Sequence, residues 1–453
     1  MNLPNFFLAD LPREAVLSPK MVRDACQTLK RNREHYLVSR PTQSIIRTLC
    51  EVGENWRQPH YNLRQLVLKE GPALTGFAEA TLAAGLDDFF SQFTAENFQA
   101  LLLQELGHWQ RFETFQASAE EQRRDRASMV RGPELLVHFA GGALPNPPFM
   151  SIILGLLSRA AQFVKCASGQ AFLPRMFAHS LYATEPKLGA CLEIAEWPGG
   201  SEPIEHELFA AADCVTATGD DETLAAIRNR LPAKVRFLGY GHKVSFGYIS
   251  HEMLGGINLQ RVIMRAAQDV VAWNQLGCLS PHLVYVEVGG STSPEQFAEL
   301  LARELEAREQ THPRGQLTAD EAASIASRRS FYEVRAAHSQ ETKMWCSSGS
   351  TAWTVVFEAD PQFQRSCLNR FVYVKAVSDI DQVLQAADAV CGKVSTVGLA
   401  APEDRAQEMA NRLARWGVSR ICPLGKMQNP PLTWHHDGRP ALGDLVTWSD
   451  WEM

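Results

Sequence analysis

One cysteine, Cys278, stands in a setting that could support nucleophilic chemistry. It lies in the segment NQLGCLSPH, between a long helical pattern and the apolar run LVYVEVGG, which predicts a buried strand. Its neighbours Gly277, Ser280 and Pro281 form turns more often than cores. A thiolate is favoured where backbone N–H groups converge or a positive charge lies near. Cys278 is therefore a candidate nucleophile.

The other cysteines are better interpreted as structural residues. The chain has ten cysteines, none of them in C-x-x-C pairs or at zinc-finger spacing, and most lie among apolar residues. They predict buried, reduced thiols in the cytoplasm. The run His435-His436-Asp437 suggests a metal, but no further ligand is suitably spaced, so we expect a structural or surface role and no metal site.

Several common catalytic and phosphate-binding motifs are absent. We find no G-x-G-x-x-G opening a helix, no P-loop, no G-x-S-x-G elbow and no H-E-x-x-H. The segment LGYGHKVSFG has glycines after a strand, but the residues that follow also resemble a strand. An ordinary Rossmann dehydrogenase is therefore disfavoured.

The elements around Cys278 predict an α/β protein of two domains, as expected for 453 residues. Residues 1–130 show mostly helical spacing, and strands alternate with helices over about 130–245. This alternation predicts a parallel sheet with helices on both faces, where ligands bind beyond the carboxyl ends of the strands. A second α/β unit follows, and the tail ends like an edge strand.

Composition excludes some classes of function. The net charge of −7 argues against a nucleic-acid surface as the main activity, and 45% hydrophobic and 21% charged residues are ordinary for a globular protein. No apolar run reaches the roughly 18 residues that a membrane helix needs. The first residues lack the basic and apolar regions of a signal peptide. We expect a soluble, cytoplasmic protein without a membrane span.

The order of several segments resembles LuxC-type acyl-CoA reductases, the fatty-acyl reductase branch of the aldehyde dehydrogenase superfamily. These segments are VHFAGGALPNPPFMSIILGLLSRAAQFVKCASG, DCVTATGDDETLAAIR, FLGYGHKVSFGYIS, NQLGCLSPH and PLGKMQNPPLTWHHDGRPALGDLVTW. The resemblance implies an aldehyde-dehydrogenase-like α/β fold with a cofactor-binding domain, a catalytic domain and an oligomerisation arm. The expected ranges are 1–254 for the N-terminal helices and cofactor domain, 255–425 for the catalytic domain and 426–453 for the arm.

The resemblance also implies roles for single residues. Cys278 matches the superfamily nucleophile, and Lys165 matches the lysine that holds the adenosine ribose. Ser168 stands where NAD-preferring relatives carry an acidic residue, which favours NADPH, with NADH as the alternative. Gly219 matches the glycine near the pyrophosphate, where a side chain would collide, and Gly200, in the turn after a strand, is a further cofactor-binding candidate.

Two departures from the superfamily pattern affect the chemistry. The glutamate that activates water in hydrolytic members is replaced by Gly239 or a neighbour, so an acyl-cysteine would survive to meet hydride or another thiol. The oxyanion asparagine falls at Gly142, and Asn146 is close but offset. Either Asn146 or the backbone N–H of Cys278 then serves the oxyanion.

The implied function is NADPH-dependent reduction of an acyl thioester to an aldehyde through an acyl-cysteine. The expected partners are an acyl-CoA or acyl-carrier donor, an acyl-activating enzyme, and further copies of the chain in a homo-oligomer. Two alternatives stay open: a hydrolytic NAD-dependent aldehyde dehydrogenase that recruits Glu193 or Glu252 as base, and a non-catalytic partner protein that keeps the fold.

Overall fold

The computed structural model describes residues 3–12, 14–142 and 144–453, which form two compact units. Unit 1 holds Met1–Thr75, Leu86–Gly241 and Pro431–Met453, and unit 2 holds Gly76–Gly85 and His242–Pro430. The chain therefore leaves unit 1 after residue 241 and returns to it at residue 431. The functional division predicted at residues 254 and 425 stays a prediction.

Helices dominate the N-terminal part of unit 1, as the spacing predicts. Ser18 begins α1 by accepting a hydrogen bond from the backbone N–H of Met21 at 3.3 Å, and Gly107 ends α5 with a φ of 72°. The helices up to residue 123 are α1 (Pro19–Tyr36), α2 (Thr42–Arg57), α3 (Asn62–Thr75), α4 (Glu79–Phe90), α5 (Ala95–Leu106) and α6 (Ala119–Arg123).

A parallel sheet follows, in the order β4-β3-β2-β5-β6. Its strands are β2 (Leu135–Ala140), β3 (Ala161–Cys166), β4 (Leu192–Glu196), β5 (Cys214–Thr218) and β6 (Arg236–Tyr240). Its connecting helices are α7 (Asn146–Leu157), α8 (Phe172–Thr184), α9 (Pro186–Gly189), α10 (Glu202–Ala211) and α11 (Asp221–Arg230). Residues of α1, α10 and α11 share one buried cluster with the sheet. The alternation predicted for this region is confirmed.

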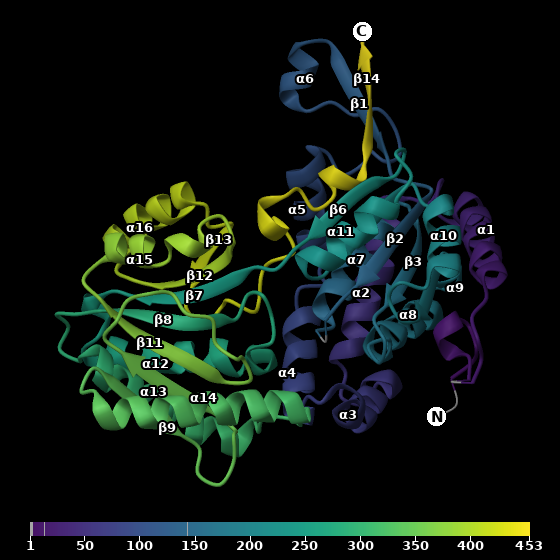
Figure 1. Cartoon of the computed structure of the whole chain (residues 1–453). Helices are drawn as coiled ribbons and strands as arrows, with labels where there is room; N and C mark the ends of the chain where they lie inside the picture. Colours follow the sequence, from purple (N-terminus) through teal and green to yellow (C-terminus); the bar gives the residue numbers. More distant parts are fainter. Residues whose placement is uncertain (1–2, 13, 143) are drawn as a thin grey trace. The chain divides into compact units, whose positions relative to one another are not determined.

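The C-terminal strand pairs with a strand that the sequence patterns did not indicate. Figure 1 shows β14 (Thr447–Glu452) beside β1 (Arg126–Arg131), and the two run antiparallel with Arg126 opposite Glu452. The charged segment at 120–126 runs through α6 to the first residue of β1. We refer to β1 and β14 as the terminal ribbon.

Unit 2 is built on a larger sheet, in the order β13-β12-β7-β8-β11-β10-β9. All neighbouring pairs are parallel except β10 with β9, which is an edge strand. Its strands are β7 (Val244–Ile249), β8 (Pro281–Glu287), β9 (Thr342–Cys346), β10 (Thr354–Glu358), β11 (Phe371–Val377), β12 (Val394–Ala400) and β13 (Arg420–Pro423). The strands β9 and β12 were not predicted, and β7 continues this sheet rather than the sheet of unit 1.

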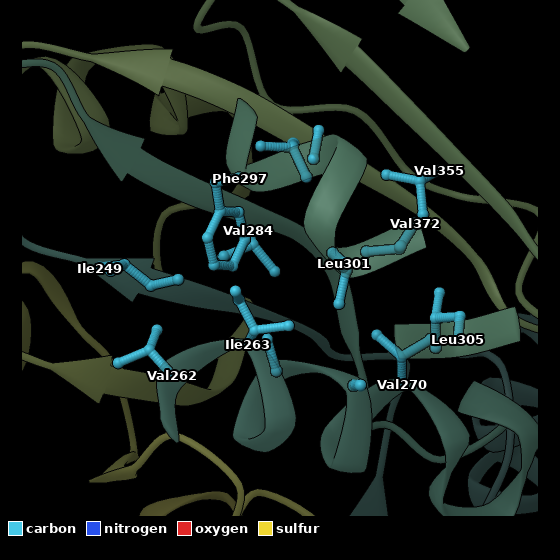
Figure 2. Packing of buried hydrophobic residues seen from close by; sticks show 14 of the residues in the cluster. Ile249, Val262, Ile263, Val270, Val284, Phe297, Leu301, Leu305, Val355 and Val372 are labelled. Carbon is cyan, nitrogen blue, oxygen red and sulfur yellow. The ribbon is translucent and has the colours of Figure 1, made fainter. Parts of the chain in front are cut away.

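Two helices cover one face of this sheet and build a core with it. Figure 2 shows Val262 and Ile263 of α12 and Leu301 of α13 facing Val284 of β8 and Val372 of β11. All five side chains are buried, so this layer fixes the position of the helix that leads to Cys278. The helices of unit 2 are α12 (Gly256–Val271), α13 (Pro294–Thr311), α14 (Ala319–His338), α15 (Ile380–Ala386) and α16 (Glu403–Trp416).

Within the described residues, no helix has the length and apolar character that crossing a bilayer requires.

Candidate active site

Cys278 lies on a turn that connects α12 to β8. Helix α12 ends at Val271, a short 3₁₀ segment covers Ala272–Gln275, and β8 begins at Pro281. The backbone N–H of Ser280 donates to the carbonyl oxygen of Gly277 at 2.9 Å, which closes a tight turn with Cys278 as its second residue. The side chain of Cys278 is exposed, whereas five other cysteines are buried. The placement therefore suits a nucleophile that substrate must reach.

The turn is preceded by backbone in an unusual conformation. Trp273, Asn274 and Gln275 have φ values of 50°, 52° and 65°. Left-handed backbone costs non-glycine residues about 1–2 kcal/mol each, and three in succession stop α12 abruptly. Burial offsets this cost, because the Trp273 ring is 4% exposed and packs edge-on against Phe77 at 5.2 Å.

A second left-handed run braces the first. Leu368, Asn369 and Arg370 have φ values of 62°, 55° and 66°, just before β11. Arg370 donates from Nε to Asn274 Oδ1 at 3.2 Å. Gln275 donates from Nε2 to the carbonyl oxygen of Phe371 at 3.0 Å. The segment leading to Cys278 is thus held by the side chain of Arg370 and by the backbone carbonyl of Phe371, which follows the second left-handed run.

Arg370 is itself fixed on the side away from Asn274. Its guanidinium pairs with Glu309 at 2.7 Å and donates to the carbonyl oxygen of His312 at 2.8 Å. Burial lowers the pKa of Arg370 to about 10, which still leaves the side chain charged at neutral pH. This brace was invisible in the sequence, because Arg370 lies 92 positions from Cys278 and in no motif.

His282 is placed close to the turn but in a neutral state. It is 7% exposed, and its Nδ1 accepts a hydrogen bond from the backbone N–H of Ser366 at 3.1 Å. Burial lowers its pKa to about 4, so the ring carries no charge at neutral pH. His282 therefore supplies no fixed positive charge to a thiolate at position 278.

The carboxylates considered as recruited bases lie elsewhere. Glu252 follows the carboxyl end of β7, and Cys278 precedes the amino end of the parallel neighbour β8. Seven residues of strand, about 23 Å, separate these two edges of the sheet. Glu193 lies within β4, where it accepts hydrogen bonds from the backbone N–H groups of Leu8 and Ile194 at 2.7 and 3.0 Å. The position of Glu252 rules it out as a base for Cys278.

The group around Glu252 is an ion-pair cluster. His251, Glu252 and Glu287 have the spacing of metal ligands, but Arg405 pairs with Glu252 at 2.6 Å and with Glu287 at 3.0 Å. Burial would raise the pKa of Glu287, but hydrogen bonds from Arg405, Tyr248 and His251 outweigh burial and lower it. The guanidinium already supplies the charge that a cation would bring.

Three cofactor candidates and the oxyanion candidate Gly142 lie along one edge of the sheet of unit 1. Gly142 follows β2, Ser168 follows β3, Gly200 follows β4 and Gly219 follows β5, and these strands are parallel. Gly142 and Gly200 have φ values of 84° and 83°, which favour glycine, and a Cβ atom on either would meet nothing within 4 Å. The carboxyl edge of this sheet is therefore open, as a ligand site requires.

A pocket opens at the ends of β2 and β3. Proline and other apolar side chains from the starts of α7 and α8 dominate its lining, with Gln170 and Thr75 as polar members. The lining residues are Thr75, Ala140, Gly142, Leu144, Pro145, Pro148, Gly169, Gln170, Phe172, Leu173 and Pro174. It separates the turn of Gly142 from the loop that carries Ser168.

Lys165 is a buried cation with an unusual environment. It is 6% exposed, and its Nζ lies 5.9 Å from the ring centres of Phe139 and Trp197. Among the described residues no acceptor or carboxylate binds its ammonium group. Burial disfavours the charged form of the ammonium group and therefore lowers the pKa of Lys165. An ammonium group in this state fits a bound hydroxyl or phosphate oxygen, so the residues present fit a nucleotide here.

A carboxylate that the sequence patterns did not single out shapes this loop. Glu196, the last residue of β4, accepts hydrogen bonds from the backbone N–H groups of Gly169 and Ala171 at 2.7 and 3.2 Å. It thereby fixes the loop on which Ser168 is exposed. An acidic residue that ends a predicted strand was the available signal.

The surroundings of Gly219 are mixed. A Cβ atom at Gly219 would meet only Thr223, at 3.4 Å, which is an ordinary contact. The collision expected from the sequence would therefore be with a bound cofactor and not with the protein. Asp220 caps α11 by accepting from the backbone N–H of Thr223 at 2.7 Å, which places a carboxylate where dinucleotide folds usually present bare N–H groups. Gly141, not singled out, is the tighter position, because its Cβ would lie 2.3 Å from the carbonyl oxygen of Thr218.

The oxyanion candidates differ in what they offer. Gly142 has no side chain, and Asn146 is the first residue of α7. The Oδ1 atom of Asn146 is buried without a hydrogen-bond partner among the described residues. An amide with an unsatisfied acceptor leaves the side chain available to rearrange around a ligand.

The histidine pair of the tail has a structural environment. His436 stacks on Tyr240 with ring centres 4.5 Å apart and an angle of 9°, and His435 lies 3.4 Å from Glu105. Burial lowers the pKa of His436. The two rings therefore contact different neighbours.

The chain matches the family model described as "Acyl-CoA reductase (LuxC)" over residues 37–448. It is 24% identical over 418 residues to a long-chain acyl-protein thioester reductase of Aliivibrio fischeri, covering 89% of this chain and 80% of that protein. It is 22% identical over 415 residues to the same kind of enzyme from Photorhabdus laumondii, covering 89% and 81%.

Solved structures are similar in fold. A glyceraldehyde-3-phosphate dehydrogenase from Methanocaldococcus jannaschii, complexed with NADP, has a TM-score of 0.69 at 9% identity, over 100% of this chain and 99% of that one. A proline utilization A protein from Bradyrhizobium japonicum has a TM-score of 0.72 at 14% identity, and the match covers 96% of this chain but 45% of that chain. The predicted aldehyde-dehydrogenase-like fold is confirmed.

Proposed function

Since the chain belongs to the LuxC acyl-CoA reductase family of oxidoreductases, we propose that it reduces an acyl thioester to an aldehyde through an acyl group carried on Cys278. The proposal rests on the exposed Cys278, which lies on a tight turn. Hydrogen bonds with Arg370 and Phe371 hold the residues that precede this turn. A nucleophile must be reachable and held in one direction, and this placement meets both needs.

The chain's own residues account for most of the chemistry. The Cys278 thiolate forms a bond to the thioester carbonyl carbon, and the bond to the donor sulfur breaks, so that the donor leaves as a thiolate and takes a proton from solvent. The backbone N–H of Cys278 stabilises the oxyanion. NADPH, when bound, supplies the hydride that reduces the acyl carbon. The electron pair of the carbon–sulfur bond then returns to Cys278 Sγ as the aldehyde leaves.

The positions of the residues considered as bases favour reduction over hydrolysis. Gly239 lies inside β6 and carries no carboxylate, Glu252 lies at the far edge of the unit 2 sheet, and Glu193 is engaged by backbone amides. Without a base to activate water, the acyl-cysteine persists long enough to be reduced. The hydrolytic alternative therefore has no base among the residues that were proposed for it.

The proposed cofactor is NADPH, held by Lys165 and Ser168, with Gly200 and Gly219 beside it. No carboxylate of the described residues forms an ion pair with Lys165, and Ser168 is exposed and uncharged, which tolerates a 2′-phosphate. Ser168→Glu should raise the Kd for NADPH at least about tenfold and change the Kd for NADH little, because like charges repel. Cofactor fluorescence titration measures both constants, and equal changes would remove Ser168 from the ribose site.

We propose a long-chain acyl thioester as substrate, because the relatives are named as reductases of long-chain acyl-protein thioesters. The donor is then coenzyme A, a carrier protein or an acyl-activating enzyme. We also propose that the terminal ribbon mediates homo-oligomers. Every residue of β14 is exposed, including Trp448 and Trp451, and β14 pairs on one side only within the described residues.

The test is direct. The purified chain is incubated with NADPH and acyl-CoA thioesters of increasing length, and aldehyde is trapped as a hydrazone while NADPH oxidation is followed. The proposal expects aldehyde in equal amount to NADPH consumed. Acid as the product would support the hydrolytic alternative. No turnover together with no labelling of Cys278 by radioactive acyl-CoA would support the non-catalytic alternative.

A further inference from the structure

The carbonyl group of Cys278 is held by a buried side chain from the neighbouring strand. The Ser245 hydroxyl donates to the carbonyl oxygen of Cys278 at 2.7 Å, and its oxygen accepts from the backbone N–H of Thr396 at 3.1 Å. Ser245 is fully buried on β7, between β8 and β12. One hydroxyl therefore links the turn of Cys278 to two strands and uses both its donor and an acceptor site.

Both neighbours of Ser245 depart from regular pairing at this level. On β8, Ser245 pairs with Pro281 and Phe246 pairs with Leu283, which leaves His282 as an extra residue. On β12, Val244 pairs with Val394 and Ser245 with Thr396, which leaves Ser395 as an extra residue. Bulges of this kind interrupt the ladder and redirect the chain, and they occur often beside active sites.

We propose that Ser245 is a positioning residue for Cys278. The two irregularities interrupt regular strand pairing beside Cys278. The carbonyl oxygen of Cys278 therefore accepts a hydrogen bond from the Ser245 hydroxyl instead of from a backbone N–H group. Holding that carbonyl fixes the peptide plane after Cys278, and with it the backbone angles that aim the thiol and its own N–H. The effect on acylation rests on the proposed function, whereas the effect on the direction of the thiol does not.

The same strand pair supplies a matched control. The hydroxyl of Ser395 is as fully buried as that of Ser245, and it has no hydrogen-bond partner among the described residues. Ser395→Ala and Ser245→Ala therefore remove the same atom from neighbouring positions. Only the second removes a bond to the nucleophile's backbone.

The experiment compares acyl-enzyme formation in these variants. With acyl-CoA in single-turnover conditions, Ser245→Ala should lower the acylation rate by about 10- to 100-fold with little change in KM, because a misdirected nucleophile reacts slowly once substrate is bound. Ser395→Ala should stay within about twofold of the unsubstituted protein. Ser245→Thr keeps the hydroxyl and should restore most of the rate, and Ser245→Cys, a weaker donor of the same shape, should fall between.

A second readout keeps this proposal separate from the proposed function. The rate of alkylation of Cys278 by iodoacetamide, followed by peptide mass mapping, should change several-fold in Ser245→Ala and not in Ser395→Ala. If the unsubstituted protein forms no acyl-enzyme, the proposed function fails while alkylation still tests Ser245. The positioning role would be overturned if Ser245→Ala and Ser395→Ala had equal rates of alkylation and equal rates of acylation. It would also be overturned if both variants lost the same Tm and their rates fell in proportion to that loss.

Discussion

The two large sheets of this protein use opposite edges. In unit 1 the candidate cofactor residues follow the strands, at the carboxyl edge, where turns with glycines such as Gly142 and Gly200 leave open space. In unit 2 the candidate nucleophile precedes β8, at the amino edge, and the carboxyl edge is occupied by the pairs of Arg405 with Glu252 and Glu287. The usual expectation for open α/β sheets holds for one unit and not for the other.

This difference shows that the loops at a sheet edge, and not the direction of the strands alone, make that edge suitable for a binding or catalytic site. The amino edge of unit 2 presents Cys278 because two left-handed segments and a buried serine replace regular structure there. The carboxyl edge of unit 1 is the proposed ligand site because turns such as those of Gly142 and Gly200 leave open space there. Binding and covalent chemistry thus depend on different structural devices, an open edge in one case and a braced turn in the other.

The largest expected effect tests whether the amino edge of unit 2 is the reactive one. Cys278→Ala should lower thioester reduction by at least about 10⁴-fold, because no other thiol can take its place on the turn. Cys391→Ala, which removes the other exposed cysteine, should leave the rate unchanged. Aldehyde formation and retention of radioactive acyl groups measure both. Label retained on Cys278→Ala would contradict the assignment.

The next effect tests whether the opposite edge is only structural. Arg405→Gln should lower the free energy of unfolding by about 2 kcal/mol, since it removes charged hydrogen bonds to the buried Glu287. The kcat for thioester reduction should not change. Arg303→Gln, which breaks an exposed pair with Glu299, is the control and should cost less than about 1 kcal/mol. Urea denaturation gives both values, and a large drop in kcat for Arg405→Gln would assign chemistry to this edge.

A smaller effect concerns the open edge of unit 1. Lys165→Met should raise the Kd for NADPH about tenfold and leave acylation of Cys278 intact, because the ammonium group is expected to bind the cofactor and not the acyl donor. Lys234→Met, an exposed lysine before β6 at the amino edge of the same sheet, should bind NADPH normally. Fluorescence titration measures these constants. An unchanged Kd for Lys165→Met would move the cofactor away from β3.

The last test concerns a pH dependence of unit 1. Burial raises the pKa of Glu193 to about 8, above the value of about 4.3 in an unfolded chain. The folded state then holds an extra proton between these values, so this group makes the protein less stable as the pH rises from about 4 to 8. Glu193→Gln should flatten the fall in Tm over that range. A Tm that falls as steeply in the variant would show that Glu193 is not the titrating group.

The fold was predictable where local patterns coincide with the family's segments. The strands β2 to β6 and β8, the helix α12 and the turn at Cys278 follow from apolar spacing and turn formers. The strands β1, β9 and β12 escaped because charged or small residues dilute their apolar pattern, as in Arg126–Arg131 and Thr342–Cys346. Pairing with distant strands, rather than local preference, forms them.

The site was predictable in its residue types and not in its supports. Cys278 and Lys165 belong to recognisable segments, and the structure adds the environment of each. Ser245 and Glu196 act on those segments from other strands, and Arg370 acts from the residue before β11. Only Glu196, an acidic residue that ends a predicted strand, carried a local signal. Contacts across a sheet depend on register and on bulges, which a single sequence does not specify.

The terminal ribbon has a consequence for how the chain acquires its structure. β1 begins at residue 126 and its partner β14 ends at residue 452, so this ribbon cannot close until residue 452 has left the ribosome. Most of unit 2, residues 242–430, is continuous and complete before then. Long loops slow folding, and domains formed early shield their apolar surface. During synthesis the amino-terminal unit should therefore be the last to finish, and it should be the part that most needs chaperones.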